Sequence, residues 1–509
     1  MPKLIVVTNR EPYALKKTSS GGVVAERQTA GLLGALEPVL QTSSGVWISW
    51  SGFERETPRD GDGLPERLDV EVGAQKWSLR RLPLSEREAS LYHYGWACRT
   101  QWPLMHLMLG RGTFDPESWR AYRRVSQRFC DAVVSAYEPG DRIWVHEHHL
   151  ALVPGLLRAA LPDARIVYSW NIPWPPADAL AALPWAADLC AGVLGADVVG
   201  VALPKYGRHL AAAAEAFLGC KPVGALAEGS DNGHGEPAPE GEIVLPHDGR
   251  STRIAVLPLG CDVGRWEERA RAARGTRSVR LRRNLGADRL ALAVDRVDST
   301  RGIAERLRAV ERFFDRYPSW RGRMVFCQVA VPSRTRVEEY RDMKKEIDGI
   351  TERINKRFGT EGWVPVRYLY RSLEPDELAV YYASADVLLA TPLADGLGFV
   401  PLEYVAARER GDGALIVSSL AGAAEYFPEA TRVNPYDEEA VAAAIHASLE
   451  LKPADAQARM RTLRERARNI DLTKCLETTW RTAFGGEWPL ATVLPPPSPT
   501  PFLESTTTH

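Results

Sequence analysis

Two arginines, Arg296 and Arg301, lie one loop apart in the stretch DRVDSTRG and could together hold a doubly charged anion such as a nucleoside diphosphate. They follow the apolar run Leu290–Val294, which predicts a buried strand, and they precede an amphipathic helix. Arginine stays charged and can bind phosphate oxygens through two parallel hydrogen bonds. Open α/β sheets bind ligands at the carboxyl ends of their strands. The spacing therefore favours a diphosphate-binding pair, and the alternative is a pair of solvated surface arginines.

A second motif, TPLADGLGFVPLEYVAA (Thr391–Ala407), leads from a predicted strand through small residues into a helix. Backbone N–H groups at a helix start attract an anion, and Gly396 and Gly398 allow close backbone approach. The residues expected to supply this contact are Leu397, Gly398, Phe399 and Val400. Glu403 could accept both hydroxyls of a ribose. The alternative is an ordinary strand–loop–helix turn capped by Asp395.

In the first half of the chain, two successive predicted strands end in polar groups, HEHH at 146–149 and Asn171 in NIPWPP. Because both clusters lie at carboxyl ends of adjacent strands, we expect them to face one cleft. Successive strand residues point to opposite faces, so only alternate residues of HEHH converge. The HExxH spacing of a helical zinc site is absent. Sugar-hydroxyl recognition or packing is favoured over metal binding, and no metal ligand is assigned.

The amino-terminal segment adds further candidates. Arg10 ends a predicted strand, and the Gly21-Gly22 pair forms either a simple turn or a loop that closes over a phosphate. Arg334 and Arg336 follow another strand, where one could meet a phosphate while the other is solvated. Tryptophans that could line a sugar site or fill the core are Trp47, Trp50, Trp96 and Trp102.

The bulk composition excludes several classes of protein. The chain has 509 residues, a formal net charge of -1 and 25% charged residues, so no basic excess indicates nucleic-acid binding. Its seven cysteines are scattered without a CxxC pair, which is typical of reduced thiols in a cytoplasmic protein. No apolar run approaches the about 20 residues of a membrane span, and the apolar run of MPKLIVVTNR is too short for a secretion signal.

Strands and helices alternate along the chain, which predicts α/β architecture with parallel sheets. Strands are expected at Leu4–Thr8, Val46–Trp50, Arg142–His146, Arg165–Trp170, Asp197–Val201, Arg253–Leu257, Leu290–Val294, Met324–Val331, Val364–Leu369, Val387–Ala390 and Leu415–Ser418. Helices are expected at Pro116–Tyr137, Leu150–Leu161, Ile303–Tyr317, Val337–Phe358, Glu377–Ala385, Val400–Arg408, Glu438–Leu451, Ala454–Asn469 and Leu472–Phe484.

At this length two domains are the default. We expect a first domain at 1–250 and a second at 251–485, whose last helices could pack back on the first, with a cleft between them. Residues 224–241 are predicted to form a surface insertion, and the Pro/Ser/Thr-rich residues 486–509 a disordered tail.

Taken together, these motifs resemble the trehalose-6-phosphate synthase family, which comprises retaining glycosyltransferases of family 20 with the GT-B fold. That fold has two Rossmann-like, doubly wound domains facing a central cleft. The similarity runs from Leu4 to Phe484. The family's VVSNR reads VVTNR here, its WxGWSG reads WISWSG, and its ERxDYxKG reads DRVDSTRG. Its PTSR reads PSR at Arg334, and its TPLRDGMNLVxxEYVAA matches Thr391–Ala407.

The departures from the family pattern fall where sugars are expected to bind. HDYHL reads HEHHL, which places Glu147 where the family has aspartate, and HIPFP reads NIPWP, which places Asn171 where it has histidine. DGMN reads DGLG, so an asparagine becomes Gly398. A family tyrosine aligns with His93, whereas Trp102 is retained. In the diphosphate motif a lysine becomes Arg301, which keeps the positive charge.

The resemblance implies roles for these residues. Arg296, Arg301 and the amides of 397–400 would hold the diphosphate of a nucleotide-sugar, and Glu403 its ribose. Asp395, Asn171 and the Gly22 loop would contact the donor side, and Glu147 would orient the acceptor. The other acceptor contacts would be Arg10, Trp47, Trp50, His93, Trp102 and Arg334. Catalysis would rest on Glu147, Arg296, Arg301 and Asp395, with no cofactor. No metal would be needed because the two guanidinium groups and the helix start stabilise the leaving phosphate, and no protein nucleophile because that phosphate takes the acceptor's proton.

Three functions are compatible with this pattern. The first is synthesis of α,α-trehalose-6-phosphate from a nucleotide-glucose and glucose-6-phosphate, with UDP-glucose favoured and GDP- or ADP-glucose as alternatives. The second is transfer to another acceptor, such as glycerol-3-phosphate or a cyclitol phosphate. The third is a non-catalytic sensor of sugar phosphates or nucleotides. No nucleic-acid or membrane partner is expected. The sequence leaves open the oligomeric state, including a homo-oligomer, and the nucleotide base, whose contacts are expected around Tyr370–Leu373.

Overall fold

The computed structural model describes residues 2–17, 23–27, 40, 43–52, 66–72, 75–226, 241–334, 337–486 and 503–504. It divides into two compact units, of which the first comprises Met1–Leu259 with Leu476–His509 and the second Gly260–Cys475. The expected boundary at 250 differs from this division. The strand β12 (Arg250–Val256) completes the first sheet instead of starting the second, since it pairs in parallel with β9 (Val198–Val201).

The described part of the first unit contains one long sheet and a small hairpin. The other strands are β1 (Leu4–Arg10), β2 (Tyr13–Lys17), β3 (Val23–Arg27), β4 (Val46–Trp50), β5 (Arg67–Val72), β6 (Gln75–Leu82), β7 (Arg142–His146), β8 (Arg165–Trp170), β10 (Val223–Gly224), β11 (Ile243–His247) and β19 (Leu503–Glu504). In the long sheet the order is β10-β11-β12-β9-β8-β7-β1-β4-β6-β5-β19, and the run from β12 to β6 is parallel. The chain therefore reverses its direction of travel across the sheet between β1 and β7.

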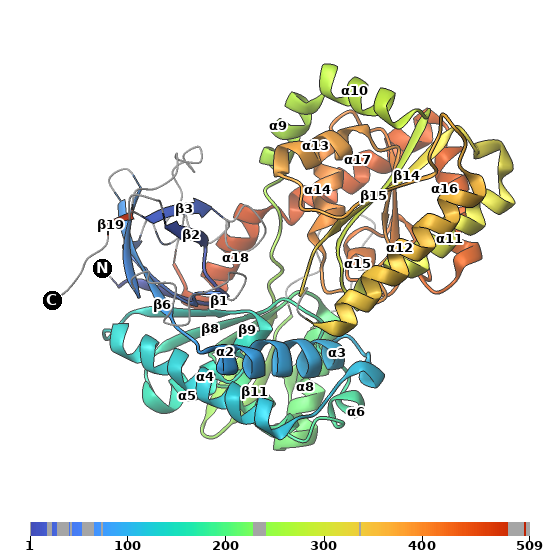
Figure 1. The fold of residues 1–509 in the computed structure, drawn as a ribbon. Coiled ribbons are helices and arrows are strands. Elements are labelled where there is room, and N and C mark those ends of the chain that lie inside the picture. The colour runs from blue at the N-terminus through green and yellow to red at the C-terminus, as the bar shows by residue number, and fades with distance from the viewer. Residues whose placement is uncertain are drawn as a thin grey trace. The chain divides into compact units, whose positions relative to one another are not determined.

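Helices cover this sheet on both faces (Figure 1). They are α2 (Glu86–Ala89), the π-helix η1 (Ser90–Gln101), α3 (Trp102–Met105), α4 (Pro116–Ala136), α5 (Val153–Ala160), α6 (Ala177–Leu180), α7 (Ala186–Val193), α8 (Pro204–Leu218) and α18 (Leu472–Phe484), with short 3₁₀ turns η2 (Leu109–Arg111) and η3 (His148–Leu150). The carboxyl-terminal end of α18 packs on β7, where the guanidinium group of Arg142 lies 4.6 Å from the ring centroid of Trp480.

Part of the carboxyl-terminal tail differs from the expectation of disorder. Leu503 and Glu504 form β19, which pairs antiparallel with β5 at the edge of the sheet. An edge strand offers unpaired backbone groups to any extended segment. The amino-acid composition of the tail does not predict such pairing. The other residues of the tail, and residues 227–240 of the expected insertion, lie outside the described part of the chain.

The second unit is a six-stranded parallel sheet of order β15-β14-β13-β16-β17-β18. Its strands are β13 (Arg289–Arg296), β14 (Met324–Val331), β15 (Val366–Leu369), β16 (Val387–Ala390), β17 (Ala414–Ser418) and β18 (Thr431–Val433). Read along the chain, the order is 3-2-1-4-5-6, which is the arrangement of dinucleotide-binding Rossmann folds. Its switch point lies between β13 and β16.

Two groups of helices cover opposite faces of this sheet (Figure 1). The helices are α9 (Val263–Ala273), α10 (Thr276–Leu285), α11 (Ile303–Arg316), α12 (Glu338–Phe358), α13 (Pro375–Ser384), α14 (Phe399–Ala407), α15 (Ala423–Tyr426), α16 (Glu438–Leu449) and α17 (Pro453–Asn469), with 3₁₀ turns η4 (Ser299–Arg301) and η5 (Pro318–Trp320). One group packs α11 against α12 and α16, and the other packs α9 against α13 and α14.

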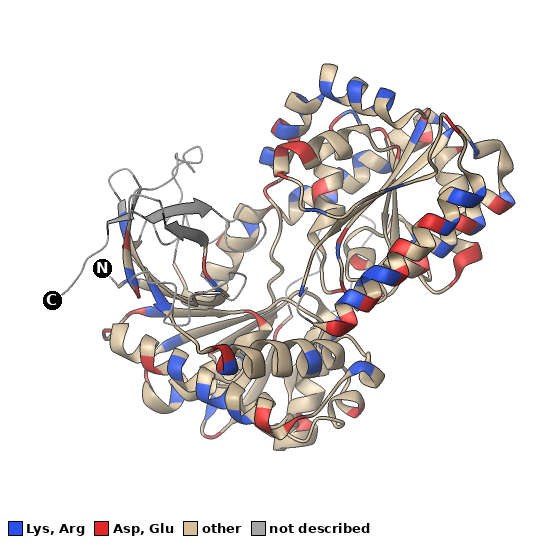
Figure 2. Ribbon diagram, viewed as in Figure 1, with Lys and Arg blue, Asp and Glu red and all other residues tan. Residues whose placement is uncertain are grey.

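Helical periodicity explains how α12 is oriented. It buries Ile347, Ile350, Ile354 and Phe358, which recur at helical spacing on one face. Acidic and basic residues alternate along the rest of the helix (Figure 2). They form ion pairs within the helix, such as Lys344–Asp348, and to α11, such as Arg353–Glu311. The apolar face fixes the helix on the sheet, and the charged face meets solvent.

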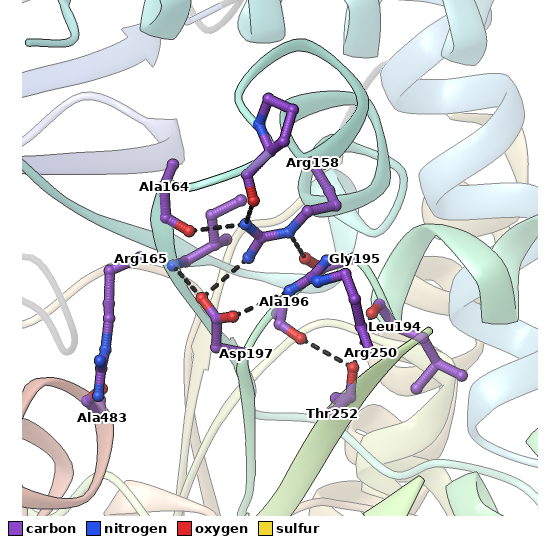
Figure 3. Close-up of polar contacts among 12 residues, drawn as sticks. Arg158, Ala164, Arg165, Leu194, Gly195, Ala196, Asp197, Arg250, Thr252 and Ala483 are labelled. Atoms are coloured by element: carbon purple, nitrogen blue, oxygen red, sulfur yellow. Dashed lines mark hydrogen bonds and ion pairs between the residues drawn. The ribbon is translucent and has the colours of Figure 1, made fainter. Parts of the chain in front are cut away.

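Aspartates fix the strands at the amino edge of each sheet, opposite the edge where ligands bind. Asp197, immediately before β9, accepts a hydrogen bond from the backbone N–H of Ile166 at 2.7 Å and from Arg158 and Arg250 at 2.9 Å each (Figure 3). Asp386, immediately before β16, accepts from the N–H of Leu290 at 2.8 Å. The same Ala-Asp-Val sequence precedes both strands, and in each unit it ties one strand to its neighbour.

Replacing Asp197 tests this tie. Asp197→Ala removes one acceptor from each of two part-buried arginines and from one backbone N–H, and we expect it to lower the free energy of unfolding by about 2 kcal/mol. Urea unfolding followed by circular dichroism measures the change. The exposed residue Asp131 provides the control, since Asp131→Ala removes the same charge from the surface of α4. Equal stabilities for the two variants would contradict the assigned role.

Candidate functional site

The switch point of the second unit brings the predicted diphosphate residues together. Arg296 ends β13, Arg301 ends the η4 turn that follows, and Asp395 follows β16, the neighbouring strand. The two loops are also joined directly, because the backbone N–H of Leu393 donates to the carbonyl of Thr300 at 2.7 Å. Three predicted residues thus share the carboxyl edge at the position where such sheets bind ligands.

Arg301 and Asp395 form an ion pair with each other. Their side chains are 16% and 14% exposed, so the pair is accessible but not fully hydrated. Burial alone would lower the pKa of Arg301, but the charges of Asp395, Asp295 and Asp298 outweigh it and raise that pKa. Sequence reasoning assigned the two residues to different parts of a ligand and did not predict that they bind each other.

Arg334 lies at the same edge but is paired with a buried carboxylate. Its guanidinium donates to Asp298 at 2.8 Å, where the two side chains are 7% and 0% exposed. Tyr340 donates to the same oxygen at 3.0 Å. Burial opposes ionisation of Asp298, yet the charges of Arg334, Arg296 and Arg301 hold its pKa well below the ordinary value. The predicted contact of Arg334 with an acceptor phosphate remains a proposal, and its companion Arg336 lies outside the described residues.

Sequence reasoning missed Arg306, which lies at the centre of this site. Its side chain is 0% exposed, and it donates to Asp295 on β13 at 2.6 Å and to Gln328 on β14 at 3.0 Å. It also donates to Thr391, after β16, at 2.9 Å and to the carbonyl of Arg301 at 3.1 Å. The available signal was its position, because Arg306 falls on the apolar face of α11, where a charged residue needs buried partners.

Among the described side chains named above, arginines outnumber aspartates at this edge. The four arginines are Arg296, Arg301, Arg306 and Arg334, and the three aspartates are Asp295, Asp298 and Asp395. One positive charge is therefore left over among these residues, in partly buried surroundings where electrostatic attraction is stronger than in water. The edge is suited to an anion with more than one negative charge.

The loop before α14 has the conformation expected for close approach of an anion. Gly398 has φ of 74°, a region that favours glycine, and a Cβ there would lie 2.9 Å from a carboxylate oxygen of Asp395. Leu397 is buried, whereas Phe399 and Val400 begin the helix and are half-buried. The first N–H groups of α14, which have no intrahelical acceptor, follow this glycine.

Glu403 lies one turn into α14 and accepts a hydrogen bond from the Tyr382 hydroxyl at 2.9 Å. Burial raises the pKa of Glu403 to about 7, despite this hydrogen bond and the nearby charge of Arg269. Burial also raises the pKa of Tyr382 well above its ordinary value, so the hydroxyl keeps its proton. Tyr382 therefore fixes one carboxylate oxygen of Glu403, which was predicted to bind a ribose.

In the first unit the switch point lies between β1 and β7, and it carries Arg10 and Glu147. Arg10 ends β1 and is half-buried. Glu147 follows β7 with φ of 70°, which is uncommon for a residue other than glycine. This backbone directs its carboxylate across the edge to the N–H of Asn9, at 2.8 Å. Two strand ends are thereby joined at the predicted acceptor side.

Rings of histidine and tryptophan extend from Glu147. His149, whose Nδ1 lies 3.9 Å from Glu147, stacks with His93 at a centroid distance of 5.5 Å and contacts His148 at 3.9 Å. Trp50 lies 5.4 Å from His93, and Trp102 lies 5.5 Å from His148. His93 comes from the π-helix η1, whose existence the sequence did not predict and which is rare at this length.

Two other predicted contacts have different surroundings. Trp47 has no exposed surface and donates to the Thr8 hydroxyl at 2.7 Å, so the structure assigns it to the core and not to a ligand surface. Asn171 is half-buried at the end of β8. Gly22, with the Gly21-Gly22 loop, lies outside the described residues.

Within the described ranges, no three histidine, cysteine, aspartate or glutamate side chains are grouped so that they could hold a metal ion. This includes the HEHH segment, where burial lowers the pKa of His146 to about 3 and keeps that ring neutral. In the same part of the chain, no helix is long and apolar enough to cross a membrane.

The family assignment follows from the sequence. A sequence model of glycosyltransferase family 20 matches residues 2–483. The chain belongs to this family. The GT-B fold expected from the resemblance is confirmed by a solved structure with a TM-score of 0.81, that of the α,α-trehalose-phosphate synthase (UDP-forming) from Burkholderia xenovorans in complex with glucose-6-phosphate. It is 27% identical to this chain and covers 94% of this chain and 99% of its own.

Two relatives are more similar in sequence. The bifunctional trehalose-6-phosphate synthase/phosphatase of Thermoproteus tenax is 35% identical over 494 residues, which are 95% of this chain but only 63% of that protein. The trehalose-6-phosphate synthase of Mycolicibacterium smegmatis is 34% identical over 471 residues, which are 92% of this chain and 90% of the relative. The chain thus spans less than two thirds of the first relative and most of the second.

The raised pKa of Glu403 predicts a pH-dependent stability. A glutamate in the unfolded chain ionises near 4.5, but the folded protein keeps this proton up to about 7. Glu403 therefore does not lower the free energy of unfolding below pH 4.5. Between pH 4.5 and about 7 it lowers this free energy progressively, and above pH 7 the loss is constant. Glu403→Gln should raise the free energy of unfolding at pH 8 by about 1–2 kcal/mol, discounted for the part of Glu403 that meets solvent.

Thermal unfolding at pH 5 and pH 8 measures this effect. The gain should be present at pH 8 and nearly vanish at pH 5. Glu346→Gln on the exposed face of α12 is the control, since this side chain is 49% exposed. A pH-independent difference between the wild type and Glu403→Gln would contradict a raised pKa at this residue.

Proposed function

We propose that this glycosyltransferase moves a glucosyl unit from UDP-glucose to glucose-6-phosphate and forms α,α-trehalose-6-phosphate. The observation that carries the proposal is the cluster of four arginines and three aspartates at the β13–β16 switch point, together with Glu403, which lies one turn into α14. The family assignment and the names of the relatives support the same reaction.

The second unit would bind the donor. The guanidinium groups of Arg296 and Arg301 and the amides of 397–400 would hold the diphosphate, and Glu403 would accept the ribose hydroxyls. As the bond from the glucosyl carbon to the phosphate oxygen breaks, negative charge grows on the leaving phosphate. Fixed cations and a helix start at that point stabilise the transition state more than the ground state.

The first unit would supply acceptor contacts. Arg10 would bind the acceptor phosphate and Glu147 would accept a hydrogen bond from the attacking hydroxyl, beside the rings of Trp50, His93 and Trp102. Asn171 would meet a sugar hydroxyl. Arg334 of the second unit would add charge near the acceptor phosphate. The leaving phosphate would take the acceptor's proton, so the mechanism uses no protein nucleophile, cofactor or metal ion.

A related transferase with another acceptor is the second candidate. It is favoured by the side chains that differ from the family pattern at the acceptor side, where Glu147 has a strained backbone and His93 stacks on His149. The cysteines among the described residues are all buried thiols, which fits the cytoplasmic location that we propose for either activity.

An acceptor panel separates these candidates. Release of UDP from UDP-glucose would be measured with glucose-6-phosphate, with glycerol-3-phosphate, with a cyclitol phosphate and without acceptor, and the products would be identified by mass. The main proposal predicts rapid release only with glucose-6-phosphate. Rapid release with another acceptor would establish the second candidate, and tight nucleotide binding without turnover would indicate a sensor. Parallel assays with GDP- and ADP-glucose identify the nucleotide.

Removing the Arg301 side chain tests the leaving-group contact. Arg301→Ala should lower kcat by about 100-fold or more, because one of two cations at the leaving phosphate is lost. Arg308→Ala is the matched control, since it removes a partly exposed arginine seven positions further on, which pairs with Glu346. Both variants are compared by UDP release and by thermal unfolding. A folded Arg301→Ala protein with turnover within twofold of the wild type would exclude Arg301 from the reaction.

A further inference from the structure

Asp395 binds the residue that should hold the ligand's diphosphate, and this raises the question of what its charge does. Its carboxylate pairs with Arg301 through one oxygen and accepts the backbone N–H of Gly396 at 2.9 Å through the other. A carboxylate beside a bound diphosphate would repel it. The Asp395 carboxylate therefore both pairs with the Arg301 guanidinium and repels the diphosphate that must take its place.

The backbones around this pair are fixed, so the pair can open only by side-chain movement. The carbonyl of Arg301 accepts from Arg306 at 3.1 Å, and its N–H donates to the carbonyl of Asp298 at 3.0 Å. On the other side, Asp395 forms a bridge with Ala421, and the N–H of Gly422 donates to the carbonyl of Gly396 at 2.7 Å. A ligand thus meets a preset pair and not a loose loop.

Gly398 provides the room for this arrangement. A Cβ at this position would lie 2.9 Å from the Asp395 oxygen that faces Arg301. The nearest obstacle is the end of a flexible side chain, so any larger residue at 398 would push the Asp395 carboxylate away from its present position. The glycine at this position, where the family pattern has asparagine, therefore favours the Arg301–Asp395 pair in this chain.

We propose that Asp395 is an internal counter-ion of Arg301, which a nucleotide-sugar displaces more readily than the nucleotide diphosphate alone. The inference rests on the proposed function. A diphosphate takes over the Arg301 guanidinium and separates the Asp395 carboxylate from this cation while bringing a new anion beside it. A sugar attached to that diphosphate supplies hydroxyl donors to the carboxylate, whereas a nucleoside diphosphate supplies none.

The counter-ion acts on specificity and on product release. It selects the intact donor over the free nucleotide, because only the donor satisfies both members of the pair. After the sugar has left, the carboxylate repels the remaining diphosphate and competes again for Arg301. The product UDP therefore binds less tightly than it would if the residue at position 395 were neutral.

The test compares the affinities of UDP and UDP-glucose by isothermal titration calorimetry. Asp395→Asn keeps the shape of the side chain and removes its charge. We expect it to bind UDP about tenfold more tightly than the wild type, while the affinity for UDP-glucose changes less than about threefold. Turnover should fall, since Asp395 also contacts the donor sugar in the proposed reaction. An unchanged ratio of the two affinities would overturn the counter-ion role.

Two further variants make the result specific. Asp288→Asn removes the same charge at the amino end of β13, where Asp288 is 72% exposed, and its affinity ratio should equal that of the wild type. Asp395→Glu keeps the charge one methylene further out, and its affinity for UDP should stay within about threefold of the wild type. An equal shift in Asp288→Asn, or a tighter binding of UDP by Asp395→Glu equal to that of Asp395→Asn, would overturn the inference. Failure of the wild type to bind either nucleotide would instead refute the proposed function.

Discussion

The buried guanidinium group of Arg306 is the interaction on which the switch point of the second unit depends. It joins the end of β13 to the middle of β14, to the residue after β16 and to the turn that carries Arg301. A charge without exposed surface is tolerated only when its donors are satisfied, so these strand ends are held in one arrangement. Arg306 also forms an ion pair with Asp295. Because Asp295 is paired in this way, the guanidinium of Arg301 faces Asp395 and a ligand.

The two units use their sheets in the same way. In each unit an aspartate ties neighbouring strands at the amino edge, and charged side chains occupy the carboxyl edge at the point where the strand order reverses. The second unit gathers arginines suited to a diphosphate, and the first combines Arg10 and Glu147 with a row of histidine and tryptophan rings. The residues that tie the strands together and the residues of the candidate sites thus lie at opposite edges of each sheet. Because the ties at the amino edge stabilise the sheet, a residue such as Glu147 at the other edge can keep a strained backbone.

Much of this was readable from the sequence because periodicity and strand-end chemistry are local properties. The strands Arg142–His146, Met324–Val331 and Val387–Ala390 have the predicted bounds. Contacts between distant segments were not readable. The pairing of Arg301 with Asp395, the Tyr382 hydroxyl on Glu403 and the membership of β12 in the first sheet depend on tertiary placement. The π-helix also was not predicted, and its Gly95 lies against α4, where a Cβ would lie 2.2 Å from the Ser118 hydroxyl.

The most direct test of the central claim is a crystal structure of the protein with UDP bound. The account predicts diphosphate oxygens within hydrogen-bonding distance of the guanidinium groups of Arg296 and Arg301, ribose hydroxyls on Glu403, and Asp395 turned away from Arg301. A diphosphate bound elsewhere, with Arg301 still on Asp395 and Glu403 still without a ligand, would contradict it.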